Sequence, residues 1–349
     1  MEQGFIDLRS DTITPPTPAM REAMANAAVG DDVYDEDPSI NLLQEMSAKL
    51  LGKEAGLFIP SGTMGNLIAV LAHCDRGDEV IMGNLGHTFL FEGGGIAALG
   101  GVHPHTIPNQ PDGTIKLDAI RDAIRSDNIH YPISRLIILE NTHNRCGGVP
   151  LTVEYTQQTA DLAHDADLKL HLDGARIFNA AAALQVEPVE LTAPCDSITF
   201  CLSKGLCAPV GSVLCGTAAF IQKSLRLRKH LGGGMRQAGI LAAAGIVALE
   251  KMSGRLAEDH QTSAKLSQGL AALPGLIQNP PSPATNMVFI DLGAEIMTDA
   301  EGLASRLADQ NVKVGVVSQR RLRLVTHYWI QPQDIDQVVE TFKQVLSAI

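Results

Sequence analysis

The sequence predicts an α/β fold, with a large domain built on a mainly parallel, mixed sheet flanked by helices and a smaller C-terminal α/β lobe. Through the first two-thirds of the chain, short apolar runs alternate with longer segments of helical periodicity, as in strands joined by crossover helices. Several runs are nearly continuous in apolar residues, as expected for strands buried on both faces. The pattern changes near residue 254, where the smaller lobe is expected to begin.

The large domain is assigned to residues 1–253, with an N-terminal segment at residues 1–30. Its strands are expected at residues 55–59, 79–82, 136–140, 168–172, 197–201 and 212–215, with helices such as 64–73, 117–124 and 153–164 between them. An Ala-rich stretch, residues 239–252, is expected to form a buried helix that leads out of this domain.

The smaller lobe is assigned to residues 254–349. Helices are expected at residues 259–273, 300–310 and 334–348, and strands at residues 287–291 and 322–326. The run Pro280-Pro281-Ser282-Pro283 interrupts any regular structure between the first helix and the first strand. A second domain is also expected from length, because 349 residues exceed what one compact core usually holds.

Composition limits the classes of partner. The formal net charge of −12 repels nucleic-acid phosphates, so no nucleic-acid partner is expected. No apolar stretch reaches membrane-spanning length, and the first residues lack the pattern of a signal peptide. The six cysteines form no C-x-x-C pair, and no cluster has zinc or calcium ligand spacing, so no metal is expected. The chain is predicted to be soluble and cytoplasmic.

The strongest local signal is Lys204, in the segment Thr199-Phe200-Cys201-Leu202-Ser203-Lys204-Gly205. An apolar strand runs into a Ser-Lys-Gly turn, which puts this lysine at the carboxyl end of a strand, where ligands of open α/β sheets collect. Considered alone, Lys204 could equally be an exposed loop lysine.

Asp173 gives Lys204 a chemical context. An expected strand, residues 168–172, leads directly into Asp173-Gly174-Ala175-Arg176. Pyridoxal 5′-phosphate (PLP) needs a carboxylate beside its pyridine nitrogen, because only the protonated ring is a strong electron sink. Asp173 could instead cap a helix, but that role does not account for the lysine at the end of a later strand. The pair therefore favours a PLP site.

Two further segments fit such a site. The turn Pro60-Ser61-Gly62-Thr63 joins a strand to a helix, and backbone amides at a helix N-terminus bind anions such as a phosphate. It is neither a Walker A loop nor a dinucleotide fingerprint. His87 follows another expected strand, where an imidazole could stack on the cofactor ring or relay a proton. Separately, each segment also fits an ordinary helix cap or a hydrogen-bonded loop histidine.

Together these segments resemble the low-specificity L-threonine aldolases, which belong to the aspartate-aminotransferase structural group (fold type I) of PLP enzymes. The matching segments span nearly the whole chain and are residues 7–12, 30–34, 60–63, 139–144, 171–178, 201–211, 232–239 and 323–327. The most specific are Asp-Gly-Ala-Arg, Leu-Ser-Lys-Gly and Gly-Gly-Gly-Met-Arg-Gln, in that order.

The resemblance implies a role for each matching residue. The residues implied to hold the cofactor are Lys204 (as a Schiff base), Asp173 (at the pyridinium nitrogen), Ser61, Gly62 and Thr63 (at the phosphate), His87 (stacked on the ring), Arg176, and Arg236 (reaching the phosphate from a neighbouring subunit). Those implied to hold the substrate are Ser10, Arg176 and Arg323 at its carboxylate, which a planar guanidinium matches bidentately, and His130 near its hydroxyl. Lys204, His87 and His130 are the implied catalytic residues.

The activity implied is reversible aldol cleavage of L-threonine, L-allo-threonine and related β-hydroxy-α-amino acids to glycine and an aldehyde. The base that takes the hydroxyl proton is left open among His87, His130 and a water held by both. The chain departs from the family pattern at Asp35, at Cys207 and in Arg145-Cys146-Gly147-Gly148, which bears on the aldehyde pocket.

Alternatives remain at this point. Another fold type I enzyme, such as a β-eliminating lyase or an aminotransferase, would use the same cofactor on a different bond, because fold does not fix reaction. A non-catalytic PLP carrier or an interaction protein would need no competent pocket. A homo-oligomer, a dimer of dimers with shared sites, is expected because residues 232–236 suit a loop that completes a partner's pocket.

Overall fold

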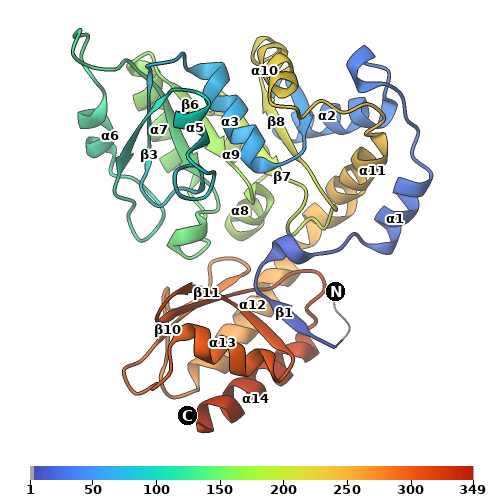
Figure 1. Cartoon of the computed structure of the whole chain (residues 1–349), viewed down its shortest axis with the longest axis vertical. Helices are drawn as coiled ribbons and strands as arrows, with labels where there is room; N and C mark the ends of the chain where they lie inside the picture. The colour runs from blue at the N-terminus through green and yellow to red at the C-terminus, as the bar shows by residue number, and fades with distance from the viewer. Residues whose placement is uncertain (1–3, 349) are drawn as a thin grey trace.

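A seven-stranded sheet forms the centre of the larger domain in the computed structural model, which describes residues 4–348 (Figure 1). Its strands, in spatial order, are β2 (Ala55–Ile59), β8 (Ser212–Gly216), β7 (Ser197–Cys201), β6 (Lys169–Asp173), β5 (Ser134–Glu140), β3 (Glu79–Gly83) and β4 (His103–Ile107). Only β8 runs antiparallel to its neighbours, so the remaining strands point the same way. This confirms the predicted α/β fold.

Helices cover both faces of this sheet, and its central strands are accordingly buried on both sides. They are α1 (Pro18–Ala25), α2 (Pro38–Leu50), α3 (Gly62–His73), α4 (His87–Leu90), α5 (Gly95–Ala98), α6 (Leu117–Ala123), α7 (Val153–Asp165), α8 (Ile177–Leu184), α9 (Pro188–Thr192), α10 (Ala218–His230) and α11 (Gly239–Val247). The predicted Ala-rich helix is α11 with the π-helical turn η4 (Ala248–Met252) that follows it.

The smaller domain has its own sheet and core. Its five strands, in spatial order, are β1 (Ile6–Leu8), β11 (Val312–Ser318), β12 (Arg321–Val325), β10 (Met287–Leu292) and β9 (Leu276–Gln278). The helices α12 (Leu256–Ala271), α13 (Ala300–Ala308) and α14 (Pro332–Ser347) pack against this sheet. Three short 3-10 turns lie outside it, in connections that lead to or belong to the larger domain: η1 (Asp11–Ile13), η2 (Asp32–Tyr34) and η3 (Asn144–Cys146). A further 3-10 turn, η5 (Ser253–Arg255), leads into α12.

The N-terminal strand β1 differs from the prediction that residues 1–30 belong with the larger domain. It pairs in parallel with β11, with Ile6 opposite Val312 and Leu8 opposite Val314. Figure 1 shows the chain then crossing to the larger domain, where α1 lies beside α11. The reason is that Leu8 joins the small domain's core, a contact between residues about 300 positions apart that local sequence pattern does not reveal. Residues 1–3 of this segment lie outside the described residues.

The parallel strands bring several loops to one edge of the large sheet. Loops after β3 and β5 and residues of β10, β11 and β12 line a common cavity, so this edge faces the smaller domain. Ligands of open α/β sheets bind at the carboxyl ends of the strands, which directs attention to the cleft between the two domains. Within residues 4–348, no helix combines the length and the apolar character needed to cross a lipid bilayer.

Candidate active site

Four of the predicted site residues stand where parallel strands end. Asp173 is the last residue of β6, and Lys204 follows β7 by three positions. His87 follows β3 and begins α4, and Ser61 follows β2 and caps α3. Because these strands share one direction, their carboxyl ends bring the four side chains to the same edge of the sheet.

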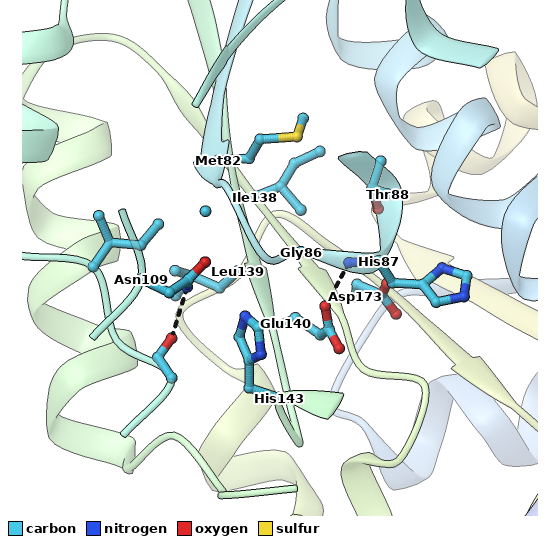
Figure 2. Close-up of a pocket in the computed structure, with 13 residues that line it drawn as sticks. Met82, Gly86, His87, Thr88, Asn109, Ile138, Leu139, Glu140, His143 and Asp173 are labelled. Atoms are coloured by element: carbon cyan, nitrogen blue, oxygen red, sulfur yellow. Dashed lines mark hydrogen bonds between the residues drawn. The ribbon is translucent and has the colours of Figure 1, made fainter. Parts of the chain in front are cut away.

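Asp173 forms the buried floor of the site. It is 3% exposed and accepts hydrogen bonds from Asn66 Nδ2 at 2.9 Å and from the amide of Ala175 at 3.3 Å. Burial, followed by the charges of Glu140 and Glu92, raises the pKa of Asp173 to about 6. Figure 2 shows Asp173 beside His87 and Glu140, at a small cavity of about 10 Å³. A cationic ring nitrogen would relieve this excess of negative charge.

Asn66 of α3 fixes the arrangement around Asp173. Its amide nitrogen donates both to Asp173 and, at 2.8 Å, to Glu92 Oε1, while its oxygen lies 3.2 Å from Nε2 of His171. Burial lowers the pKa of His171 to about 3, which keeps this imidazole neutral. A neutral His171 can donate from Nε2 to the Asn66 oxygen and accept from the Ser197 hydroxyl at Nδ1, 2.8 Å away. The side chain of Asn66 is thereby held in one orientation.

His87 is oriented from two sides. Its Nδ1 lies 2.9 Å from Glu92 Oε1, and its backbone amide donates to Glu140 Oε2 at 2.7 Å, the second contact being drawn in Figure 2. The hydrogen bond that Nδ1 donates to Glu92, against the opposing effect of burial, raises the pKa of His87 above its ordinary value. With Nδ1 directed at a carboxylate, Nε2 is the ring nitrogen left for a ligand or a proton.

His87, Glu92 and Asp173 also form a group that could bind a metal ion, with one donor atom of each within 4.8 Å of the others. This trio was not predicted, because its members come from different elements of the fold and have no ligand spacing in the sequence. The amide of Asn66, however, donates to an oxygen of Glu92 and to an oxygen of Asp173. A donor N–H occupies the position between the carboxylates that a cation would need. The arrangement is therefore better suited to hydrogen bonding than to a metal.

The turn before α3 has the form of an anion site. Ser61 caps the helix by accepting from the amide of Met64 at 3.2 Å, and both Ser61 and Thr63 are exposed at the helix N-terminus. Gly62 has no room for a side chain, since a Cβ would lie 2.9 Å from Cys201 Sγ. Exposed amides at the start of a helix of this length suit a phosphate group.

Lys204 lies within the electrostatic range of these groups. Its carbonyl accepts from the hydroxyl of Thr14 at 2.8 Å, which holds the turn after β7 in place. The charge of Lys204 opposes the rise in the pKa of Asp173 and in that of His87, so the amine is close to both. A lysine amine, a buried acid and a helix N-terminus around one space fit the aldehyde, the ring nitrogen and the phosphate of PLP.

The predicted carboxylate-binding arginines differ in how they are paired. Arg176 is buried and binds Asp11 through two nitrogens, at 2.6 and 2.7 Å. Burial alone would raise the pKa of Asp11, but the positive charges of Arg176, Lys204 and Arg323 hold this pKa well below its usual range. Arg323 on β12 meets only neutral acceptors in its described hydrogen bonds, Asn144 Oδ1 at 2.7 Å and the carbonyl of Arg9 at 3.2 Å. Arg323 is thus the more open of the two toward an anion.

Burial and the charge of Arg176 lower the pKa of Arg323 to about 10, and the nearby charge of Asp11 only partly offsets them. Its Nε is buried without a hydrogen-bond partner within residues 4–348. Ser10 immediately precedes Asp11 in the sequence, but its hydroxyl accepts from Thr12 and caps the short turn η1. The contacts of Ser10 and Arg176 with a substrate stay predictions.

Two predicted residues are not brought to the site within one chain. His130 is exposed in the loop that precedes β5, at the opposite edge of the sheet from Glu140, which ends that strand. It cannot meet a substrate bound beside Asp173 of the same chain, because the length of β5 separates them. Arg236 is 55% exposed and pairs with Asp31 at 3.0 Å. Its predicted contact with another subunit's phosphate stays a prediction.

Several polar residues of the site were not predicted from sequence. Glu92, Asn66 and Asp11 each bind a residue that was predicted, and Glu140 binds the backbone of His87. Asp11 and Glu140 belong to segments that resemble the L-threonine aldolases, residues 7–12 and 139–144, so this resemblance was a usable signal for them. Glu92 and Asn66 lie in a loop and a helix, and nothing in their sequence context indicated their contacts.

Comparison with known proteins agrees with this geometry. The model of the beta-eliminating lyase family matches residues 7–293. Low-specificity L-threonine aldolase 1 of Arabidopsis thaliana is 48% identical, covering 99% of this chain and 98% of that protein. The low specificity L-threonine aldolase of Escherichia coli K12 is 45% identical, and the match covers 98% of this chain and 100% of that protein.

Solved structures share the fold. The threonine aldolase of Leishmania major superposes with a TM-score of 0.82 at 22% identity, covering 97% of this chain and 99% of that one. The serine palmitoyltransferase of Sphingomonas wittichii superposes with a TM-score of 0.78 at 16% identity, covering 99% of this chain and 88% of that one. From the family model and the two curated relatives, the chain belongs to the beta-eliminating lyase family and, with these relatives, to the low-specificity L-threonine aldolases.

Proposed function

We propose that this chain uses PLP to cleave L-threonine, L-allo-threonine and related β-hydroxy-α-amino acids to glycine and an aldehyde, reversibly. The observation that carries the proposal is the convergence of Lys204, Asp173 and His87 at one sheet edge beside the helix N-terminus at Ser61. Nearly full-length identity of 48% to an L-threonine aldolase supports the same reaction.

Lys204 would hold PLP covalently, with Ser61, Gly62 and Thr63 at its phosphate. When bound, PLP supplies an electron sink for the pair released as the Cα–Cβ bond breaks. Asp173 would keep a proton on the ring nitrogen, which its position among Glu92 and Glu140 favours, because a neighbouring cation offsets their mutual repulsion. Asn66 would hold the Asp173 oxygen in place for that contact.

Arg323 would bind the α-carboxylate of the amino acid. Its guanidinium already lies in the cleft, and within residues 4–348 it donates hydrogen bonds only to neutral acceptors and its buried Nε has no partner. A bidentate carboxylate would fix the rotation of the bound amino acid, which decides the bond that breaks. Ser10 and Arg176 are proposed to assist, with Asp11 fixing Arg176 in place.

His87 would accept the β-hydroxyl proton at Nε2. The contact between Nδ1 and Glu92 favours the tautomer that carries its proton on Nδ1, which leaves Nε2 free to act as a base. His130 remains a candidate only as a residue of a neighbouring subunit, and a water held by the two imidazoles is the third candidate.

The role of Glu92 gives a prediction about pH. Glu92→Gln removes the charge that raises the pKa of His87, so this pKa falls and the neutral base persists to lower pH. The acidic limb of the kcat/KM profile is expected to move to lower pH, and the value of kcat/KM at the optimum to fall about tenfold as the ring loses its fixed orientation.

His87→Asn is expected to remove that limb and lower kcat/KM about 10²-fold or more. An unmoved limb in both variants would exclude His87 as the base.

The test of the proposed reaction is a product assay with the purified chain and added PLP. Equimolar glycine and acetaldehyde from L-threonine are expected, with the aldehyde followed by coupled reduction. A β-eliminating lyase would instead release ammonia and 2-oxobutyrate, and an aminotransferase would consume a keto acid and leave the cofactor as its amine form. Either of those product sets, without glycine, would overturn the proposal.

We also propose a cytoplasmic homo-oligomer, a dimer of dimers, in which neighbouring subunits complete the sites. Its support is an exposed apolar surface: Val33 and Tyr34 are 48% and 71% exposed, and Val33 lines a cavity with the exposed Leu225 of α10. Apolar side chains gathered on a surface are typical of a subunit contact. Arg236, exposed nearby on the loop after α10, is the residue proposed to reach the partner's phosphate.

A further inference from the structure

A second, larger cavity opens beside His87 in the cleft between the domains. Its volume is about 390 Å³, within the range of small-molecule sites and far more than the methyl group of threonine needs. The larger domain contributes His87, Phe91 and Arg145, and the smaller domain contributes Phe289, Val316 and Arg323. Because Arg323 is proposed to hold the α-carboxylate, the rest of this cavity is where the substituent on the β-carbon would lie.

The lining of this cavity is cationic although the whole chain is acidic. Arg145 and Arg323 both line it, and none of the described residues that line it is an aspartate or glutamate. The nearby carboxylates of Glu92 and Glu140 lie behind the lining and bind His87 and the backbone of Asn144. Arg176 does not add a free charge, because Asp11 neutralises it through two hydrogen bonds. One α-carboxylate would therefore neutralise Arg323 and leave one positive charge, that of Arg145.

Arg145 is half-buried in the short turn η3 at the end of β5. Its guanidinium lies 6.0 Å from the centroid of the Phe91 ring, and within residues 4–348 it has no hydrogen bond or ion pair. Arg145 is also close enough to Arg323 to help lower the pKa of that residue. Two guanidinium groups that repel each other across a ligand cavity are stabilised when anions occupy it.

Resting on the proposed aldol cleavage, we infer that the pocket selects β-hydroxy-α-amino acids whose β-substituent carries a carboxylate, with Arg145 binding that second carboxylate. Phe91 supports the guanidinium from one side, and Asn144 and Arg323 lie next to it in the same lining. The simplest such substrate is 3-hydroxyaspartate. Its Cα–Cβ bond breaks, the hydroxyl loses its proton and Cα gains one, so glycine and glyoxylate form without an oxidant.

The experiment compares 3-hydroxyaspartate with 3-hydroxyasparagine, an amide of nearly the same shape without the second charge, and with L-threonine. In the wild-type enzyme, kcat/KM for the acid is expected to exceed that for the amide by about tenfold or more, the scale of a charge-assisted hydrogen bond. In Arg145→Met this preference is expected to disappear, while L-threonine cleavage stays within about threefold of wild type. Arg145→Lys should retain part of the preference.

The control variant is Arg306→Gln, an exposed arginine on α13 in the smaller domain, which should leave all three values unchanged. The inference is wrong if the wild type does not favour the acid over the amide. It is also wrong if Arg145→Met lowers kcat/KM for all three substrates by the same factor, because Arg145 would then bind the α-carboxylate or stabilise the fold.

A binding measurement separates this inference from the proposed reaction. Calorimetry would compare succinate with its monoamide, succinamate, on the PLP-loaded wild type and on Arg145→Met. Tighter binding of succinate by the wild type only is the expected result. If L-threonine is cleaved but the wild type binds both ligands equally, the inference fails alone. If succinate is preferred through Arg145 but no β-hydroxy amino acid is cleaved, the proposed reaction has failed instead.

Discussion

Lys204→Ala is expected to abolish cleavage of L-threonine, lowering kcat/KM by about 10⁴-fold or more, the scale seen when a covalent catalytic group is removed. Among the described residues, the two other cations that act on Asp11 are Arg176 and Arg323, and a guanidinium cannot take the place of the lysine amine. The measurement is product formation at saturating PLP. It is combined with the visible absorbance of the bound cofactor, which should vanish in the variant.

The fold should tolerate this substitution. Lys204 is only partly buried, and its backbone carbonyl, rather than its side chain, receives the hydrogen bond from Thr14. Lys251→Ala, an exposed lysine on η4, provides the matched control and should retain both colour and activity. Borohydride treatment of the wild type followed by peptide mass spectrometry should find PLP on residue 204. Attachment at any other lysine would contradict the proposed site.

The strands of the large sheet could be predicted because burial on both faces leaves a simple sequence pattern. The predicted strands 55–59 and 197–201 coincide with β2 and β7, and the others agree within about two residues, the usual uncertainty of element boundaries. The edge strand β4 was missed because His103, Pro104 and His105 break the apolar run. Such residues are tolerated at an edge, where one side of the strand needs no partner.

The smaller sheet was predicted less completely. In β11, Lys313 and Gly315 interrupt the valines, and only Val312 and Val314 of that strand are buried. The three-residue β1 is too short to carry a pattern, and its pairing with β11 depends on contacts across almost the whole chain. Local periodicity contains no information about such long-range pairing.

Some residues of the candidate site could be predicted from the sequence and others could not. Lys204, Asp173, His87 and Ser61 could be placed together in advance, because the carboxyl ends of parallel strands must share an edge. Glu92 reaches His87 from the segment between α4 and α5, whose course sequence pattern does not determine. His130 shows the reverse error, since its match to a motif gave no information on which end of β5 it would occupy.

Asp173→Asn is expected to have opposite effects on activity and on the stability of the PLP-free protein. Asparagine cannot provide the negative charge that keeps the ring nitrogen protonated, so kcat/KM should fall on the order of 10³-fold, as for other electrostatic groups in active sites. Stability without PLP should rise, because Asp173 is buried beside Glu92 and Glu140. An uncharged amide removes that repulsion.

The pH dependence follows from the direction of the shift. The pKa of Asp173 is about 6 in the folded chain against an ordinary value of 3.8, so between these values the folded state binds more protons than the unfolded state. This group's contribution to stability is therefore complete below pH 3.8 and is lost as pH rises through about 6. The free energy of unfolding of Asp173→Asn should match that of the wild type near the acidic end and exceed it at pH 8 by on the order of 3 kcal/mol.

Urea unfolding of the PLP-free proteins across this pH range provides the measurement, with Asp118→Asn as control because that side chain is 90% exposed. Adding PLP should stabilise the wild type more than Asp173→Asn, since only the wild type offers a carboxylate to the pyridinium. The two halves of the prediction have one cause: the charge that destabilises the unliganded chain is the charge that the cofactor requires. If Asp173→Asn were less stable than wild type at pH 8 without PLP, the buried acid would be satisfied by the protein alone, and its place beneath the ring nitrogen would lose its physical basis.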